Sequence, residues 1–455
     1  MTGTLAAVRA STLRAALTGR IGTVRQLSGL AIEADGPDAV IGEVCTILPR
    51  HGGAPVHAEI VGVRPGAVTL MPYAAAHGLG VGSEVVATGR MASIGVGVRL
   101  LGRVIDGFGE PLDGKPRPGC SVRRPLHARP LNPMERPRIE HVLETGVRSL
   151  DTLLTLGQGQ RVGIFAGSGV GKSTLLGMVA RHVKADINVI ALIGERGREV
   201  REFIDKQLGE EGLRRSVVVV ATSDQPALAR VHAAYAAISI AEHFRDEGRQ
   251  VLLTMDSVTR LAMARREIGL SAGEPPTARG YTPSVFAELP QLCERCGTAA
   301  GGGSITALLT VLVEGDDMNE PIADCLRATL DGHIVLSRAI AHQGRYPAID
   351  VLQSASRLMS DLVDAPTRAL ATEVVRLLAV LERNRQLVDI GAYEAGGNAE
   401  LDAALAVAPA LRAFLAQREG GESRDASLQA LRQALAQSAA ATRMHGGPQV
   451  ESRHG

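Results

Sequence analysis

An apolar strand that runs into a glycine-rich turn and then into a helix is the most constraining feature of this chain. Residues Gly163 to Ser173 read Gly-Ile-Phe-Ala-Gly-Ser-Gly-Val-Gly-Lys-Ser, and a helical stretch follows. The backbone N–H groups of such a turn curl round an anion, and the helix N-terminus adds a positive dipole. This arrangement is typical of a phosphate-binding P-loop, in which Lys172 reaches the phosphates and the Ser173 hydroxyl can bind Mg²⁺. The predicted nucleotide-binding residues of the turn are Gly167, Ser168, Gly169, Val170, Gly171, Lys172, Ser173 and Thr174.

The turn departs from the generic pattern at one position, because Ala166 stands where the pattern has glycine. Alanine is the smallest substitute, and Gly167 and Gly169 keep the loop flexible. The chain has 49 lysines and arginines but only four lysines, so a lysine at position 172 is unusual for it. A compact ammonium on a thin stem fits there, whereas a planar guanidinium would not. A chance Gly-Lys-Ser in a surface loop is the alternative, and the strand, loop and helix order disfavours it.

Size and composition limit the class of protein. A chain of 455 residues is long enough for two or three domains. A formal net charge of +1 predicts no overall attraction to nucleic acid or anionic membranes. Five cysteines without a signal peptide indicate reduced thiols in the cytosol, and no apolar run is long enough for a transmembrane helix.

Composition changes along the chain and predicts several regions. Residues 20–90 contain short β-rich runs between turns, which indicates a small β-barrel. Such barrels often bind nucleic acid on aromatic side chains, but residues 1–90 contain a single aromatic residue, so we favour an architectural role. Residues 139–360 alternate apolar runs with helical stretches, which predicts an α/β fold with a mainly parallel, buried sheet. Residues 5–18 can form a short helix, for which partner docking and a frayed terminus both stay open.

Charged residues follow two further predicted strands. Asp256 ends an apolar strand about 80 residues after the P-loop, where P-loop enzymes hold Mg²⁺ or its water. Glu195 and Arg196 stand at the tip of another strand. Glu195 can orient and deprotonate a water, and Arg196 can hold that carboxylate or stabilise the transferring phosphoryl group. A solvated charge cluster is the alternative, and the position directly after the P-loop helix disfavours it.

Two later residues are candidates for contacts with a nucleotide. Tyr346 precedes a proline in a chain with only six Phe, five Tyr and no Trp, and its ring can stack on adenine. Arg357 can act as an arginine finger that neutralises charge on the γ-phosphate. Ordinary packing and a surface salt bridge stay open for both, because their local spacing excludes neither.

Taken together, these segments resemble the flagellar type III protein-export ATPases, a family related to the catalytic subunits of rotary ATP synthases. The matching strings are Phe165–Thr174, Leu192–Val200, Gly273–Pro276, Pro283–Phe286, Glu314–Asp317, Asp331–Val335 and Tyr346–Asp350. The resemblance implies ATP and Mg²⁺ as ligands, and Ala166 is common in the family. It implies that Lys172 and Ser173 bind phosphate and Mg²⁺ and that Asp256 lies near the metal. Glu195 is implied to be the catalytic carboxylate, with Arg196 beside it. Tyr346 is implied to line the adenine site, and Arg357 to act across a subunit boundary.

The resemblance also implies an architecture and partners. Together with the composition of the chain, it predicts a partner-docking segment at 1–19, a β-barrel domain at 20–90 and a RecA-like ATPase domain at 139–360. The proline-rich residues 91–138 are expected to form a connector, residues 361–443 a helical C-terminal domain, and residues 444–455 a disordered tail. The expected assembly is a homohexamer that binds a regulatory stalk protein through the N-terminal segment. Other expected partners are the export gate, chaperones and secreted flagellar proteins, without nucleic acid. The expected location is the cytoplasm at the base of the flagellar export apparatus, peripheral to the inner membrane at most.

Four functions are compatible with the P-loop motif. An export ATPase is favoured over an RNA-translocating ring helicase, because residues 1–90 are poor in aromatic side chains and nearly neutral. A non-catalytic ring subunit should lack Glu195, and a proton-driven synthase subunit needs a partner chain of similar fold. Flagellar and injectisome ATPases share the motifs, and the string Ser216–Leu228 favours the flagellar system.

Overall fold

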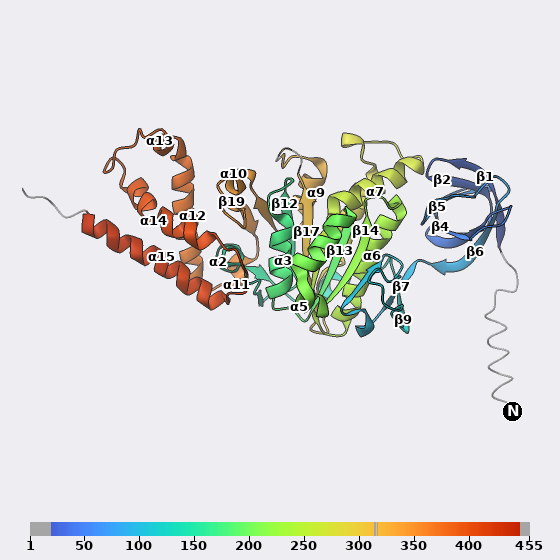
Figure 1. The fold of residues 1–455 in the computed structure, drawn as a ribbon, viewed down its shortest axis with the longest axis horizontal. Helices are drawn as coiled ribbons and strands as arrows, with labels where there is room; N and C mark the ends of the chain where they lie inside the picture. Colours follow the sequence, from blue (N-terminus) through green and yellow to red (C-terminus); the bar gives the residue numbers. More distant parts are fainter. Residues whose placement is uncertain (1–19, 314, 316, 446–455) are drawn as a thin grey trace, which may run out of the picture.

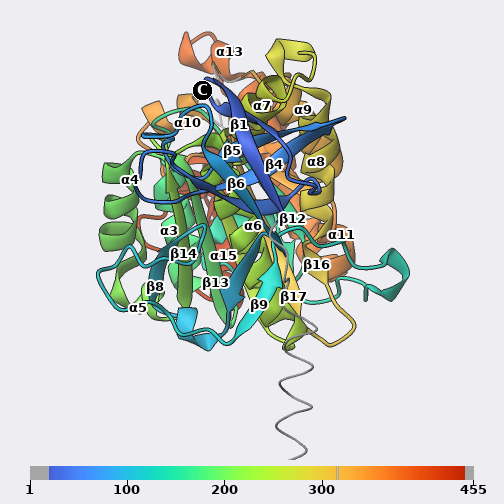
Figure 2. The same cartoon turned by 90° about the vertical axis from the view of Figure 1, so that its right-hand side faces the viewer.

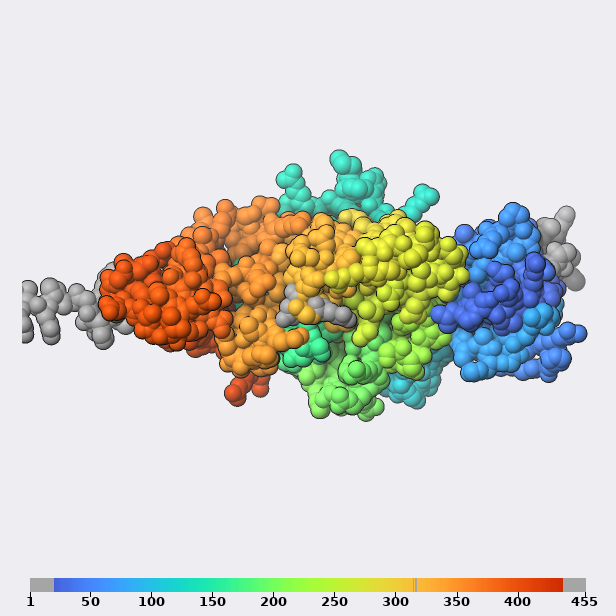
Figure 3. Space-filling model, turned by 90° about the horizontal axis from the view of Figure 1, so that it is seen from above, coloured from blue at the N-terminus to red at the C-terminus, as the bar shows by residue number. Residues whose placement is uncertain are grey.

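The computed structural model describes residues 20–313, 315 and 317–445 and arranges them in three regions along one axis (Figure 1). A barrel lies at one end, an α/β region in the middle and a bundle of helices at the other end (Figure 1), and the space-filling view shows the same order along the long axis (Figure 3). The predicted order of barrel, α/β core and helical region is therefore confirmed. The candidate docking helix at 5–18 and residues 446–455 of the predicted tail lie outside the described residues.

The N-terminal region is a closed barrel of six antiparallel strands in the order β1-β2-β5-β4-β3-β6. Apolar side chains alternate along its strands and fill the interior, among them Val24, Ile47 and Leu70. Closure leaves no strand edge exposed. The strands are β1 (Ile21–Ser28), β2 (Ala31–Asp35), β3 (Glu43–Leu48), β4 (Val56–Arg64), β5 (Ala67–Pro72) and β6 (Glu84–Met91).

The central sheet follows the order β19-β18-β12-β17-β15-β13-β14-β8, with a short strand, β16 (Gly297–Thr298), paired beside β17. All neighbours in the main path are parallel except the edge strand β19. The strands are β8 (Arg103–Asp106), β12 (Arg161–Ala166), β13 (Ile187–Glu195), β14 (Ser216–Thr222), β15 (Gln250–Asp256), β17 (Ser304–Leu312), β18 (Gly332–Leu336) and β19 (Ile349–Ser356).

Helices cover both faces of this sheet, so its strands are buried on both sides (Figure 2). Val189 and Ala191 of β13 face one layer, formed by α6 to α9, whereas Ile190 and Leu192 face the layer that contains α2 and α3. The first layer comprises α6 (Ala227–Asp246), α7 (Val258–Ser271), α8 (Pro283–Glu294) and α9 (Pro321–Thr329). Other helices near the sheet are α2 (Arg148–Leu153), α3 (Lys172–His182), α4 (Gly197–Glu202), α5 (Gly209–Arg214) and α10 (Arg338–His342).

The predicted connector at 91–138 contributes more than an extended link. Its strand β8 pairs in parallel with β14 and forms the edge of the central sheet. Two further strands, β7 (Ser93–Val96) and β9 (Val122–Pro125), pair with each other. The sequence gives little sign of β8, because a four-residue strand among glycines and prolines has no apolar pattern of its own.

The C-terminal region is helical, and its core is continuous with the side of the sheet that carries α3. Val374 and Leu411 are buried in this shared core, which joins the helices to the α/β region. The helices are α11 (Met359–Leu362), α12 (Ala365–Arg383), α13 (Arg385–Asp389), α14 (Ala399–Leu415) and α15 (Arg424–His445).

A buried polar cluster joins the barrel to the α/β region. Glu59 of β4 accepts hydrogen bonds at Oε2 from the Tyr73 hydroxyl at 2.9 Å and from His232 Nε2 of α6 at 2.8 Å. The Tyr73 and His232 rings lie 4.5 Å apart between centroids, and Phe108 packs on both. Burial alone would raise the pKa of Glu59, but His232 and Tyr73 hold that pKa below its ordinary value. The barrel is therefore held to α6 by a largely buried contact that includes the Glu59 carboxylate.

Replacing His232 by alanine is expected to loosen the barrel, because it leaves the buried Glu59 carboxylate without its main partner. Loss of a partner of a buried polar group costs about 1–3 kcal/mol. Hydrogen exchange across β4 and β5, followed by mass spectrometry, should show a lower opening free energy by that amount. The exposed His51 gives the control His51→Ala, and equal exchange in both variants would contradict the prediction.

Candidate nucleotide site

The P-loop residues form one continuous turn between β12 and α3. The turn begins after Ala166 and ends at Gly171, directly before the helix. Gly169 and Gly171 have φ angles of 78° and 90°, a left-handed conformation that favours glycine. Ser168, Gly169, Ser173 and Thr174 are exposed, whereas Val170 is buried and fixes the turn to the core. The structure therefore presents a preformed, open cradle of backbone N–H groups at a helix N-terminus.

Two carboxylates from neighbouring strands meet the P-loop lysine. In the order β12-β17-β15-β13, the carboxyl ends of the parallel strands share one edge of the sheet. Lys172 Nζ makes an ion pair with Asp256 Oδ1 and lies 3.5 Å from Glu195 Oε1. The structure therefore brings together three of the residues predicted from sequence.

Burial and charge shift the pKa values of this cluster. Burial opposes the charged form of Lys172, but Asp256 and Glu195 raise its pKa above the ordinary value. The pKa of Glu195 is raised to about 7, because burial together with the neighbouring Asp256 and Glu199 outweighs the lowering by Lys172. A carboxylate with a pKa near neutral pH can take up and release a proton under ordinary conditions, as a general base must.

The oxygen atoms around this cluster fit a magnesium ion. Lys172 and Thr310 both contact Oδ1 of Asp256. The other carboxylate oxygen, Oδ2, makes no hydrogen bond with any residue that the structure describes. The Ser173 hydroxyl belongs to an exposed residue in the first turn of α3. Carboxylate and hydroxyl oxygens are ligands that Mg²⁺ prefers, so Ser173 and Asp256 are suitable to hold it.

Tyr346 lies against the P-loop although it is far from it in sequence. A Cβ atom added to Gly171 would come within 3.2 Å of the Tyr346 ring. The ring is 42% exposed, so one part of it contacts the turn and the rest faces solvent. This position suits a ring that stacks on a bound base.

Arg196 and Arg357 lie outside this cluster within the chain. The Arg196 side chain is 78% exposed and lies 3.5 Å from Glu199, although its neighbour Glu195 points to Lys172. Arg357 follows β19, where Ser356 pairs with Gly332 at the start of β18. The P-loop follows the other end of the neighbouring strand, since Ala166 pairs with Leu336. The two points are about 13 Å apart along the strand. Arg357 therefore lies near the amino ends of the parallel strands, and the P-loop lies at their carboxyl ends.

Sequence reasoning missed Arg260, which lies beside Gly194, the residue before Glu195 on β13. A Cβ atom added to Gly194 would come within 2.9 Å of Arg260 Cβ. The buried Arg260 Nε has no hydrogen-bond partner in the described part of the chain. The only sequence signal is its place four residues after Asp256, in the first turn of α7. The structure thus places a further basic residue beside the strand end that carries Glu195.

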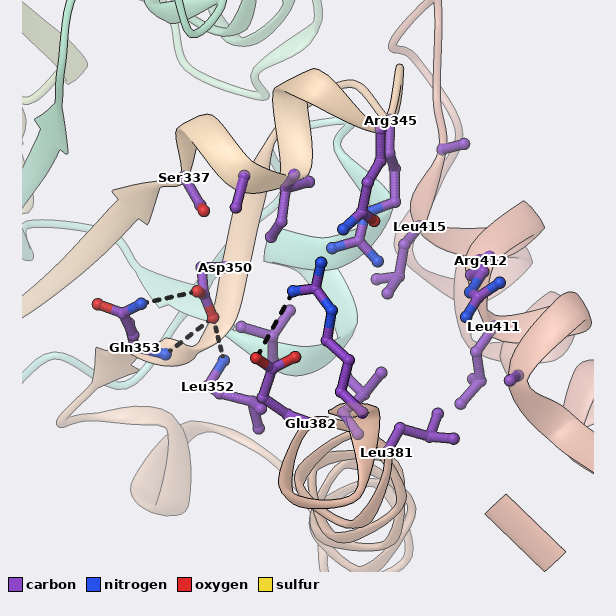
Figure 4. A pocket seen from close by; sticks show the side chains of 18 of the residues that line it. Ser337, Arg345, Asp350, Leu352, Gln353, Leu381, Glu382, Leu411, Arg412 and Leu415 are labelled. Carbon is purple, nitrogen blue, oxygen red and sulfur yellow. Dashed lines mark hydrogen bonds and ion pairs between the residues drawn. The ribbon is translucent and has the colours of Figure 1, made fainter. Parts of the chain in front are cut away.

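A separate cavity of about 880 Å³ lies between α10, β19 and the C-terminal helices α12 and α14 (Figure 4). Arg345, Arg412 and an Arg385–Glu382 pair line it, and Asp350 is held by Gln353. None of the P-loop residues lines this cavity. The predicted phosphate site is therefore the open turn at the sheet edge and not this cavity.

Each region of the chain matches a known family of domains. Residues 24–89 match the β-barrel domain of the ATP synthase alpha/beta family, and residues 146–356 match its nucleotide-binding domain. Residues 363–437 match the C-terminal domain of the type III secretion ATPase EscN.

Whole-chain comparisons give the same result. The chain is 55% identical to the flagellum-specific ATP synthase of Bacillus subtilis (strain 168), over 88% of this chain and 91% of that protein. It is 51% identical to the type 3 secretion system ATPase of Xanthomonas euvesicatoria, over 88% and 90% of the two chains. The assembled ATPase EscN of enteropathogenic E. coli superimposes with a TM-score of 0.86 at 43% identity, over 91% of this chain and 100% of that one. EscN in complex with its central stalk EscO gives a TM-score of 0.84 at 42% identity, with the same coverage. The chain therefore belongs to the family of flagellum-specific ATP synthases and type III secretion ATPases.

Proposed function

We propose that this chain is the ATP-hydrolysing subunit of a flagellar type III protein export apparatus and couples hydrolysis to delivery or unfolding of export substrates. The observation that carries the proposal is the meeting of Lys172, Glu195 and Asp256 beside an open P-loop. It stands in a chain 55% identical to a flagellum-specific ATP synthase.

The geometry supports a division of labour in hydrolysis. The turn at 167–174 binds the ATP phosphates through its backbone N–H groups, and Lys172 exchanges its carboxylate partners for phosphate oxygens. Glu195, freed from that contact, orients the attacking water and takes its proton. Ser173 and Asp256 would hold the magnesium ion, which would supply positive charge to neutralise the phosphates. Tyr346 supports the adenine ring.

Arginine side chains would complete the charge balance at the phosphates. Arg196 is exposed and adjoins Glu195, so a change of rotamer can bring it to the phosphates or to that carboxylate. Arg357 is exposed and stands at the far edge of the sheet, where its Nη2 donates to the backbone oxygen of Arg327. In a homohexameric ring it would serve the site of the neighbouring subunit. A solved relative, EscN, is described as an assembled ATPase, which supports a ring for this chain.

The expected partners follow from the family. EscN has been solved in complex with its central stalk EscO, which supports a stalk partner here. We assign the regulatory stalk contact to residues 1–19 and expect the chain at the cytoplasmic base of the export apparatus, with the export gate, chaperones and secreted flagellar proteins. No helix in the described residues is long and apolar enough to cross a membrane. Injectisome ATPases are similar as well, so a virulence secretion system is the second candidate.

Deleting this chain from its host should abolish export of flagellin and hook protein to the medium. The full-length chain should restore export, and the same chain with Glu195→Gln should not. Immunoblots of culture supernatants measure the outcome, with cell-pellet levels as the control for expression. Normal flagellar export in the deletion strain would contradict the flagellar assignment, and loss of injectisome secretion in that strain would favour the alternative.

Glu195→Gln should bind ATP but hydrolyse it about 10²–10⁴-fold more slowly, because the amide cannot accept the proton of the water. Phosphate release measures turnover, and a fluorescent nucleotide measures binding. The control is Glu202→Gln, the same change in an acidic residue of α4 whose side chain pairs with Lys206, away from the cluster. Near-normal turnover of Glu195→Gln would remove Glu195 from the mechanism.

A mixture of Arg357→Ala and Lys172→Ala chains should regain ATPase activity that each variant lacks alone. Mixed rings contain interfaces where an intact Lys172 half meets an intact Arg357 half. In the control, the Arg357→Ala chain is replaced by a chain that carries both substitutions. Neither chain of that mixture has an intact Lys172, so no interface of the mixed ring is complete. Absence of rescue in mixed rings that are shown to assemble would contradict a shared site.

A further inference from the structure

A buried hydroxyl touches the magnesium-site carboxylate from the strand between the two halves of the site. Thr310 belongs to β17, which lies between the P-loop strand β12 and the Asp256 strand β15. Its side chain is fully buried, and Oγ1 lies 2.8 Å from Asp256 Oδ1 and 3.1 Å from the backbone oxygen of Met255. Since β17 is the strand between β12 and β15, this contact reaches Asp256 from the P-loop side of the sheet.

The hydroxyl has a single proton and two acceptors within reach. A hydrogen bond to a carboxylate is shorter and stronger than one to a neutral carbonyl. The shorter of the two distances is the one to Asp256, in agreement with donation to the carboxylate. Thr310 Oγ1 makes no further hydrogen bond within the described residues, and nearby positions of β17, such as Leu308 and Val311, are apolar and buried.

This bond decides which oxygen of Asp256 faces the site. Rotation of a carboxylate about its last torsion is loosely restrained, so its orientation depends on hydrogen bonds. Thr310 and Lys172 both contact Oδ1, and Oδ2 makes no hydrogen bond with a described residue. If Lys172 moves to a phosphate, Thr310 is the contact that keeps Oδ1 turned inward.

We propose that Thr310 is a positioning residue that holds Asp256 so that Oδ2 faces the magnesium ion of the bound nucleotide. The inference rests on the proposed ATP site and adds a residue that touches neither nucleotide nor metal. Partners that orient a metal-binding group typically change metal affinity by about 10–100-fold when they are removed.

The test compares Thr310→Val, which removes the hydroxyl, with Thr310→Ser, which keeps it. A fluorescent ATP analogue is titrated into the full-length protein with Mg²⁺ and again with EDTA. Thr310→Val should lose about 10-fold or more of the Mg²⁺-dependent affinity and keep the affinity in EDTA, and Thr310→Ser should match the unaltered protein. Mn²⁺ binding followed by electron paramagnetic resonance in the presence of ADP should show the same order.

Thr306→Val is the matched control, because Thr306 is also buried on β17 and its hydroxyl accepts a hydrogen bond from the Gly159 N–H, outside the site. It should change thermal stability without changing the magnesium dependence. If Thr310→Val unfolds, Thr310→Ala repeats the measurement without a methyl group against the carboxylate.

Equal magnesium dependence in Thr310→Val, Thr306→Val and the unaltered protein would overturn the inference. So would a loss of affinity that Thr310→Ser fails to restore. If the unaltered protein binds no nucleotide at all, the proposed function fails first. Normal binding by the unaltered protein together with normal binding by Thr310→Val would remove only the role of Thr310.

Discussion

A buried lysine held between two carboxylates is the interaction on which the site depends. The side chains of Lys172, Glu195 and Asp256 are only 13%, 17% and 4% exposed. Removing one partner from a buried ion pair is costly, because it leaves an uncompensated charge away from water. The three groups therefore hold one another in place until another anion replaces the carboxylates. Nucleotide phosphate is such an anion, so in the proposed function ligand binding is an exchange of partners around one ammonium group.

The sheet makes this cluster possible by aligning strand ends. Strands β12, β17, β15 and β13 are parallel neighbours and are buried on both faces, so their carboxyl ends stop at a common edge. Glu195 and Asp256 each end a strand and project from a rigid support. Thr310 belongs to the intervening strand and reaches Asp256 from the side. Groups that must be placed within a fraction of an ångström are thus carried by the stiffest part of the molecule.

The regions on either side of the sheet have different relations to the site. The barrel is joined to α6 through Glu59 and His232, and the helical region shares the core on the α3 side. Tyr346 contacts Gly171 in the same chain, whereas Arg357 stands at the other edge of the sheet. One chain thus carries the proposed phosphate-binding half of a site and a distant arginine that its own P-loop does not meet. This spacing is the physical reason to propose a ring in which neighbouring chains share each site.

The sequence by itself determined the features that depend on residues close to one another along the chain. The P-loop, the apolar strands that end at Glu195 and Asp256, and the C-terminal helices all follow from local hydrogen bonding and periodic burial. Short elements without such patterns escaped it: β2 has two acidic residues in five positions, and β8 exists because β14 offers an edge to pair with. Only the tertiary structure decided the order of the strands, since β17 comes late in the chain yet inserts between β12 and β15. That insertion brings Thr310 to Asp256 and leaves Arg357 away from Lys172, and such long-range contacts have no signature in local sequence because they depend on which strands pair.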